Sequence, residues 1–402
     1  MIKRTLQELC LNITDGKHGD CENEENSGYY FISCKDIFDG QINYKNARQI
    51  TKADFEETHK RTMLEVDDIL LTNSGTIGRM AFVTDREATT KTTFQKSVAI
   101  IKPDKQKVLP RYLYYQLQNC VPQFINSSNG SAQKNLLLST MRTFQIEIEE
   151  NREKQEKIAD TLSAYDDLIE NNQKQIKLLE EAAQRLYKEW FVDLRFPGHE
   201  NTKIVDGVPE GWNWCKLEDA IQLDPKVTLT KERMKQFIPM SALSTSSMVL
   251  DESQFTETTS NSGSKFQNGD TLLARITPCL ENGKTAYVSG LKSDEGAVGS
   301  TEYIVMRAKT INSYMVYLLA RTDDFRQSAI NSMSGSDGRQ RVKSDKLKML
   351  DYLHPTSELV EKFENVEEPI FEKIYRLSKQ MQQTKQARDL LLPKLMSGEV
   401  EA

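Results

Sequence analysis

Residue types that carry catalysis or bind metals are scattered along the chain rather than grouped. The stretch "ENGKT" (281–285) ends like a phosphate-binding loop, but Pro278 stands where that motif requires a glycine. "KPDKQK" (102–107) holds a Pro-Asp pair without the acidic-x-Lys triplet that a nuclease would place nearby. The sequence also lacks the Asn-Pro-Pro-aromatic motif of amino methylation. We therefore expect a chain that is not an enzyme by itself.

The composition indicates the cellular compartment and the broad class of the protein. The six cysteines form no CxxC pair and the four histidines are dispersed, so we expect no metal site and no disulfide framework. The apolar runs are too short to cross a membrane, and the first residues have no apolar core of signal-peptide length. These features predict a cytoplasmic protein, and a hydrophobic content of 38% is enough for real cores.

The chain repeats itself at an offset of about 205 residues. "DDILLTNSGTIGRMAFV" (67–83) resembles "GDTLLARITPCLENGKTAYV" (269–288), and "LPRYLYYQL" (109–117) resembles "INSYMVYLL" (311–319). Gly130 pairs with Gly335 at an offset of 205 residues. A period this long indicates a duplicated domain rather than a solenoid.

Each copy combines strand and helix signals, which predicts an α+β fold. Short apolar runs beside a Gly-containing loop predict strands, and the two Tyr/Leu-rich segments predict helices. The polar junction from Arg195 to Trp214 is typical of a linker. The expected organisation is a first globular domain, a long helix, a linker with a second globular domain, and a second long helix, over 1–150, 151–195, 196–350 and 351–402.

Apolar residues at alternating spacings of four and three predict two long helices that pair along a seam. Two such helices in one duplicated chain favour an antiparallel intrachain coiled coil, although a coiled coil between chains is the alternative. Asn172 is either a buried amide that fixes the register or a solvated residue on a rotated helix. Glu367 and Arg388 interrupt the second pattern. The predicted seam residues are Ile158, Leu162, Tyr165, Ile169, Asn172, Ile176, Leu179, Leu186 and Trp190 in the first helix, and Ile370, Ile374, Leu377, Met381, Leu391 and Leu395 in the second.

Several of these stretches together resemble the specificity (S) subunits of type I restriction-modification enzymes. The resemblance covers essentially the whole chain. It lies in "FQNGDTLLARITPCLENGKTAYV" (266–288), "GVPEGWNWCKLEDA" (207–220), "LLPKLMSGEV" (391–400) and "EKQEKIADTLSAYDDLIENNQKQIKLLE" (153–180). The first domain departs most from the family pattern, with a shorter central loop at 72–79.

The resemblance implies a function in recognition of double-stranded DNA. Each domain is a target recognition domain that would read one half of a bipartite, asymmetric site, and the helices would set the spacer and dock two modification (methyltransferase) subunits. Those partners would bind S-adenosylmethionine and methylate adenine, and restriction/translocase subunits would use ATP and Mg²⁺. No cofactor is implied for this chain.

The residues expected to contact DNA are polar and basic side chains in loops where the two copies differ, because base edges need donors and acceptors and phosphates need cations. The segment "GRQRVK" (338–343) is the densest cluster. The candidates are Asn73, Ser74, Thr76, Arg79, Lys91, Gln95, Lys96, Ser131, Gln133, Lys134 and Asn135 in the first domain, and Arg275, Thr277, Asn282, Lys284, Ser336, Arg339, Gln340, Arg341 and Lys343 in the second.

Two other functions compete with this interpretation. A stand-alone nuclease-methyltransferase would need the catalytic motifs that the sequence lacks. A coiled-coil adaptor with duplicated protein-binding domains would share the architecture but would not bind DNA in the salt-dependent manner that phosphate contacts produce.

Overall fold

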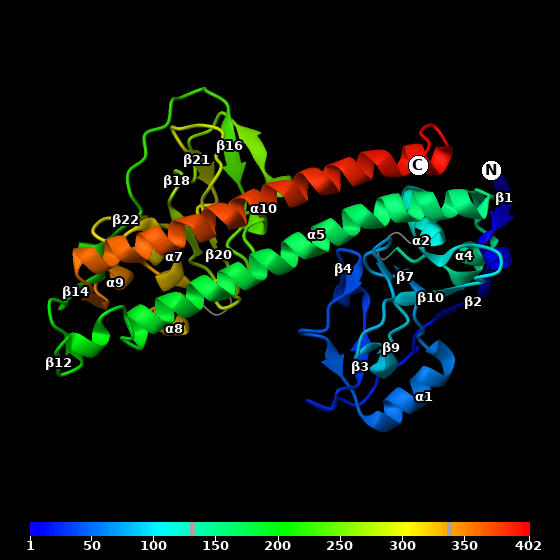
Figure 1. Cartoon of the computed structure of the whole chain (residues 1–402), viewed down its shortest axis with the longest axis horizontal. Coiled ribbons are helices and arrows are strands. Elements are labelled where there is room, and N and C mark those ends of the chain that lie inside the picture. The colour runs from blue at the N-terminus through cyan, green and yellow to red at the C-terminus, as the bar shows by residue number, and fades with distance from the viewer. Residues whose placement is uncertain (129–133, 336–339) are drawn as a thin grey trace. The chain divides into compact units, whose positions relative to one another are not determined.

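The computed structural model describes residues 1–128, 134–335 and 340–402, and it divides into two compact units. Unit 1 comprises 1–168 and 384–402, and unit 2 comprises 169–383. Each unit contains a globular part and a portion of both long helices, α5 (Arg152–Tyr187) and α10 (Ser357–Ser397) (Figure 1). Within the described residues, no helix is both long and apolar enough for a membrane span.

Unit 1 is built on a four-stranded antiparallel sheet in the order β2-β10-β7-β8. A second sheet has the order β6-β3-β9, in which β3 and β9 are parallel, and β1 pairs with β11. The strands are β1 (Ile2–Thr5), β2 (Cys10–Asp15), β3 (Tyr30–Ile32), β4 (Ile37–Phe38), β5 (Gln41–Ile42), β6 (Arg48–Gln49), β7 (Ile69–Thr72), β8 (Met80–Phe82), β9 (Thr92–Phe94), β10 (Val98–Pro103) and β11 (Gln145–Ile148). The helices are α1 (Lys52–Thr62), α2 (Pro110–Asn119), α3 (Val121–Asn126) and α4 (Leu138–Thr143).

Unit 2 repeats this topology. Its four-stranded sheet has the order β15-β22-β19-β20, its second sheet the order β17-β16-β21-β18 with β16 and β21 parallel, and β14 pairs with β23. The strands are β12 (Ile204–Val205), β13 (Val208–Pro209), β14 (Asn213–Lys216), β15 (Ile221–Leu223), β16 (Lys235–Ile238), β17 (Thr256–Thr258), β18 (Ser264–Phe266), β19 (Thr271–Ala274), β20 (Thr285–Tyr287), β21 (Ala297–Gly299), β22 (Tyr303–Ala308) and β23 (Asp351–His354). The helices are α6 (Leu217–Ala220), α7 (Ser313–Arg321), α8 (Asp323–Asn331) and α9 (Ser344–Lys348).

The matching strand orders confirm the α+β class and the duplication. The predicted strands on either side of the central loop are β7 and β8 in unit 1 and β19 and β20 in unit 2. The two Tyr/Leu-rich segments form α2 and α7, as expected. Strands β3 (sequence YFI) and β16 (sequence KQFI) occupy equivalent places in the second sheets of the two units.

The long helices pair in opposite chain directions. In unit 1 the first turns of α5 and the last turns of α10 share one core, which includes Leu162 and Leu395. In unit 2 the end of α5 packs beside the start of α10, where the ring centroids of Trp190 and Phe363 lie 5.4 Å apart. This arrangement agrees with the antiparallel pairing that the repeat predicted. Every predicted seam position of the first helix is buried or partly buried, including Asn172, which is 2% exposed, and Trp190 in the π-helical turn Lys188–Val192 that follows α5.

Arg388, one of the two residues that interrupt the second seam, pairs with a charged residue of the first helix. The guanidinium of Arg388 donates to Asp166 of α5 at 2.6 Å, and the hydroxyl of Tyr115 donates to the same carboxylate at 2.6 Å. At the matching place in unit 2, Tyr317 packs against the ring of Phe371 instead, with centroids 5.9 Å apart. A charged contact in one unit thus corresponds to an aromatic contact in the other.

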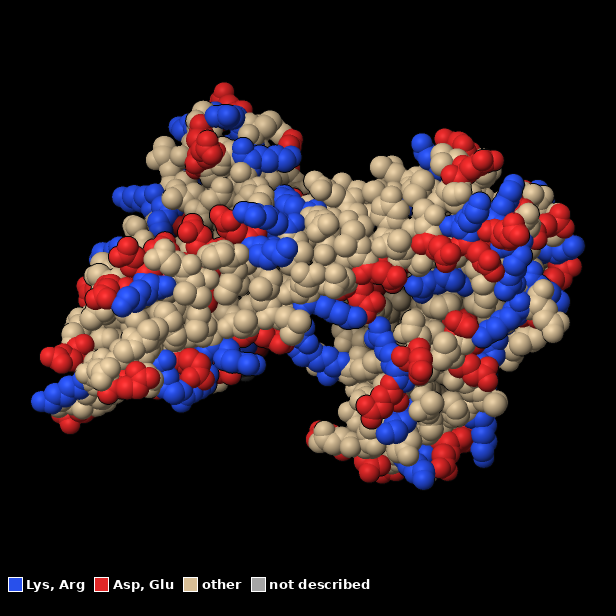
Figure 2. All heavy atoms as spheres, in the orientation of Figure 1, with Lys and Arg blue, Asp and Glu red and all other residues tan. Residues whose placement is uncertain are grey.

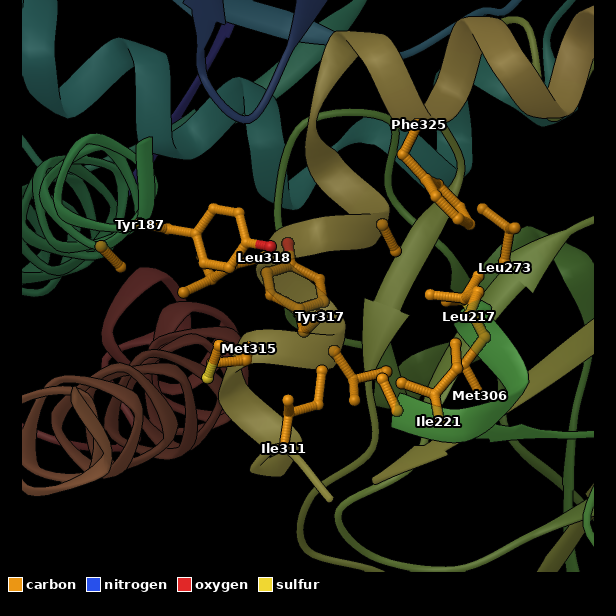
Figure 3. Packing of buried hydrophobic residues seen from close by; sticks show 14 of the residues in the cluster. Tyr187, Leu217, Ile221, Leu273, Met306, Ile311, Met315, Tyr317, Leu318 and Phe325 are labelled. Atoms are coloured by element: carbon orange, nitrogen blue, oxygen red, sulfur yellow. The ribbon is translucent and has the colours of Figure 1, made fainter. Parts of the chain in front are cut away.

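The core of unit 2 continues from the helix pair into the sheet (Figure 3). Tyr187 extends from α5 toward α7, where Met315 and Leu318 lie, and Ile221 and Met306 lie on the side of the four-stranded sheet. Burial of large side chains such as these stabilises a fold by about 1.5 to 3 kcal/mol each. The helices are therefore part of the core of the globular region rather than an attachment to it.

Glu367 gives a test of the seam. Its side chain is 0% exposed, neither carboxylate oxygen has a hydrogen-bond partner within the described chain, and burial raises its pKa to about 7 from 4.5. A carboxyl with a raised folded-state pKa contributes stability that is complete below pH 4.5 and is lost as the pH rises through about 7.

We expect Glu367→Gln to leave the free energy of unfolding nearly unchanged at pH 5 and to raise it at pH 8 by an amount on the order of 2 kcal/mol. Urea denaturation at both pH values measures this, and Glu368→Gln, one position along on the exposed face, is the matched control. An equal effect of Glu367→Gln at both pH values would contradict the burial of an unpaired carboxyl.

Candidate nucleic-acid interface

The loop between β7 and β8 is closed by Thr72. Its hydroxyl donates to the carbonyl of Thr76 at 2.5 Å and accepts from the backbone N–H of Arg79 at 2.9 Å. The N–H of Gly78 donates to the Thr72 carbonyl at 3.0 Å, and Gly75 and Gly78 have φ values of 78° and 95°, which favour glycine. These contacts give the polar loop a fixed backbone on which Ser74, Thr76 and Arg79 are carried.

Backbone hydrogen bonds join this loop to two other predicted segments of unit 1. The N–H of Asn73 donates to the carbonyl of Ser97 at 3.0 Å, and the N–H of Leu136 donates to the carbonyl of Asn73 at 2.8 Å. Ser74 and Asn135 form an antiparallel bridge. The structure therefore brings together the candidate segments 73–79, 95–97 and 134–135.

Unit 2 contains the same backbone frame. The N–H of Arg275 donates to the carbonyl of Glu302 at 3.0 Å, and the N–H of Val342 donates to the carbonyl of Arg275 at 2.9 Å. Ile276 and Arg341 form the antiparallel bridge. This frame matches Asn73 with Arg275, Ser97 with Glu302, and Asn135 with Arg341. The two units thus have equivalent positions with different side chains.

The candidate residues differ in exposure. Asn73 is buried, with a side-chain oxygen that lacks a partner within the described residues. The exposed candidates are Thr76, Arg79, Lys91, Lys96, Lys134, Asn135, Asn282 and Lys343, and the partly buried ones are Ser74, Gln95, Arg275, Thr277, Lys284, Gln340 and Arg341. Ser131, Gln133, Ser336 and Arg339 lie outside the described residues, and so does part of the "GRQRVK" cluster.

Some of the basic candidates make internal contacts. Arg275 donates through Nε and Nη2 to the carbonyl of Val342, at 3.1 and 2.9 Å, and Lys284 donates to the carbonyl of Met240 at 2.9 Å. Charged side chains that donate to backbone carbonyls of another loop join the two loops, and they have fewer donors left for a ligand. For Arg275 and Lys284 a structural role therefore accompanies any contact with DNA.

Glu302 was not identified from the sequence. Its carboxylate accepts from Nε of Arg341 at 3.0 and 2.9 Å and from Nη2 at 2.7 Å. The Arg341 guanidinium holds the pKa of Glu302 below its ordinary value. The two residues are 39 positions apart, and no spacing in the sequence signals their contact.

A second group missed by sequence reasoning adjoins the candidate segment 95–97 of unit 1. Lys17 forms a parallel bridge with Gln95, and His18 and Arg61 both contact the buried carboxylate of Asp15, with His18 Nε2 2.8 Å from it. These residues lie on β2, on the loop after it and on α1. No spacing in the sequence signals this grouping, because the topology creates it.

Basic and acidic side chains are interspersed over the elements of both units on the face shown in Figure 2. Among the described residues, no cluster of three or more His, Cys, Asp or Glu side chains could hold a metal ion.

Comparison with known proteins shows which proteins this chain resembles. The model of the type I restriction modification DNA specificity domain matches residues 3–181. The MjaIX specificity subunit of Methanocaldococcus jannaschii, a type I restriction enzyme subunit, is 27% identical over 384 residues, which cover 92% of this chain and 86% of that protein. Over most of its length the chain is therefore similar to type I restriction enzyme specificity subunits, and its first part matches their DNA specificity domain.

Two further similar proteins bear on the first part of the chain and on its fold. The EcoAI specificity subunit of Escherichia coli is 35% identical over 140 residues, covering 34% of this chain and 24% of that one. The crystal structure of the type I restriction-modification S subunit from M. genitalium covers 98% of this chain and 95% of its own, with a TM-score of 0.57 and 16% identity. The second likeness bears on the fold alone.

The internal contacts of Arg275 give a prediction about stability. We expect Arg275→Met to lower the free energy of unfolding by about 1 to 2 kcal/mol, because the buried carbonyl of Val342 loses two charged donors. Lys343→Met, which changes an exposed residue of the same segment, should leave it nearly unchanged. Thermal denaturation of both variants measures the difference, and equal midpoints would show that Arg275 does not join the two loops.

Proposed function

We propose that this chain is the DNA specificity subunit of a type I restriction-modification complex, in which each unit reads one half of a bipartite, asymmetric site. The observation that carries the proposal is the repeated backbone frame with different polar side chains at matched positions. Because the two units share the same backbone hydrogen bonds in these loops, we expect both to dock on the duplex in the same way. Because their side chains carry different donors and acceptors, we expect them to read different half-sites. All of the predicted contact residues, including those outside the described range, remain proposals.

The chain acts with partners that supply the chemistry. Two modification subunits would bind S-adenosylmethionine and methylate adenine, and restriction/translocase subunits would use ATP and Mg²⁺ in the cytoplasm.

Adenine methylation by the purified chain, with and without its modification subunits, tests the proposal. We expect methylation of one bipartite sequence by the complex and none by the chain alone. Affinity for duplex DNA should fall steeply with salt, because phosphate contacts release counterions. Methylation by the lone chain, or the absence of a bipartite site for the complex, would contradict the proposal.

The long helices are the proposed ruler between the half-sites. Both helices continue across the boundary between the units, at Leu168/Ile169 in α5 and Gln383/Thr384 in α10, so both must be lengthened together. Four residues add about 6 Å of helix and rotate the rest of the helix by about 40°. One base pair is about 3.4 Å long.

We expect insertion of four residues at both boundaries to lengthen the unread spacer by one or two base pairs and to leave both half-sites unchanged. Methylation mapping of the variant measures this. Insertion of two residues at each boundary, which rotates the helix by about 200°, is the control and should abolish methylation. Unchanged spacing in the four-residue variant would show that the helices do not set the distance.

A further inference from the structure

At one pair of equivalent positions in the two units, the backbone is held in the same way while the exposed side chains differ in chemistry. Asn135 of unit 1 and Arg341 of unit 2 bridge the equivalent loop residues Ser74 and Ile276. Asn135 is exposed, and the side chain of Arg341 is 42% exposed. The neighbouring equivalent positions, Asn73 and Arg275, are less accessible to a ligand. Asn73 is buried, and Arg275 donates to the Val342 carbonyl.

Arg341 is held on its backbone and on its side chain. Its N–H and carbonyl exchange two hydrogen bonds of 3.0 Å with Ser334, and its guanidinium is held by Glu302. A guanidinium oriented by a carboxylate presents its donors in one direction, which favours a specific partner over a diffuse phosphate contact. In unit 1 the position equivalent to Glu302 is Ser97, so no carboxylate at that position orients the side chain of Asn135.

The chemistry of the two side chains points to two different bases. In the major groove, arginine pairs with the O6 and N7 acceptors of guanine, and asparagine pairs with the N6 donor and N7 acceptor of adenine. We propose that Arg341 reads a guanine in the half-site of unit 2, that Asn135 reads an adenine at the matched place in the half-site of unit 1, and that Glu302 is a positioning residue for Arg341. This inference rests on the proposed function and names the bases that its sites contain.

Methylation mapping of the complex with its modification subunits tests the assignment in unit 2. Arg341→Asn should lower the preference for guanine at one position of one half-site by about tenfold or more, with the other half and the spacer unchanged. Arg341→Lys, which keeps the charge but not the planar fork, should have a similar effect. Glu302→Gln should relax the same position partially.

A phosphate contact would give a different pattern. If Arg341 binds only a phosphate, Arg341→Asn would weaken methylation of all sequences equally and lower the salt dependence of binding, while Arg341→Lys would behave as the wild type. That pattern, or an unchanged guanine preference in Arg341→Asn, would overturn the assignment. Lys346→Ala, at an exposed basic residue of α9 that is not among the candidates, should retain the wild-type recognition sequence and is the control.

The reciprocal change tests unit 1 independently. The double variant Ser97→Glu with Asn135→Arg transfers the pair from unit 2 to its matched positions, and it should convert an adenine preference to guanine in the other half-site. Thermal unfolding shows whether the variants remain folded. A wild-type complex without any bipartite site would overturn the proposed function itself, whereas a normal site that neither set of changes alters would overturn only the base assignment.

Discussion

The structure depends on burial of the apolar stripes of α5 and α10. In each unit one stretch of α5 and one stretch of α10 share a continuous core with the neighbouring globular region, so neither helix is solvated on that face. The apolar area removed from water there is the main favourable contribution to folding. Because the helices complete the cores, each globular region has a fixed attachment to the helix portions of its own unit, and the polar loops between strands are left free to differ.

Polar groups inside this apolar seam cost stability and specify alignment. Arg388 is compensated by Asp166, whose carboxylate also accepts from Tyr115, whereas within the described chain Asn172 Nδ2 and both oxygens of Glu367 lack partners. Uncompensated groups of this kind destabilise the folded state. They also disfavour any shifted pairing that would place them against larger apolar surfaces, as a buried amide does in a coiled coil.

Local patterns in the sequence were sufficient for the helices, the central strands and the duplication. The four-three spacing from Ile158 to Trp190 predicted a helix that the structure contains, because one buried face imposes a periodicity. The contact between Arg388 and Asp166, 222 positions apart, had no such signal, and the sequence indicated only that Arg388 interrupts a pattern. The pairing of Glu302 with Arg341 is similar, since it depends on how three loops meet. Loop residues such as Arg79 and Asn135 could be proposed from their types, but the internal contacts of Arg275 and Lys284 required the tertiary structure.

The central claim is that the two repeats are independent readers on one helical frame. Its most direct test is a chain in which residues 1–150 are replaced by a second copy of residues 212–355, combined with the modification subunits and examined by methylation mapping. The account predicts a symmetric site, in which the half-site read by unit 2 occurs twice in opposite orientations. Retention of the original first half-site, or a change in the sequence of both halves, would contradict it.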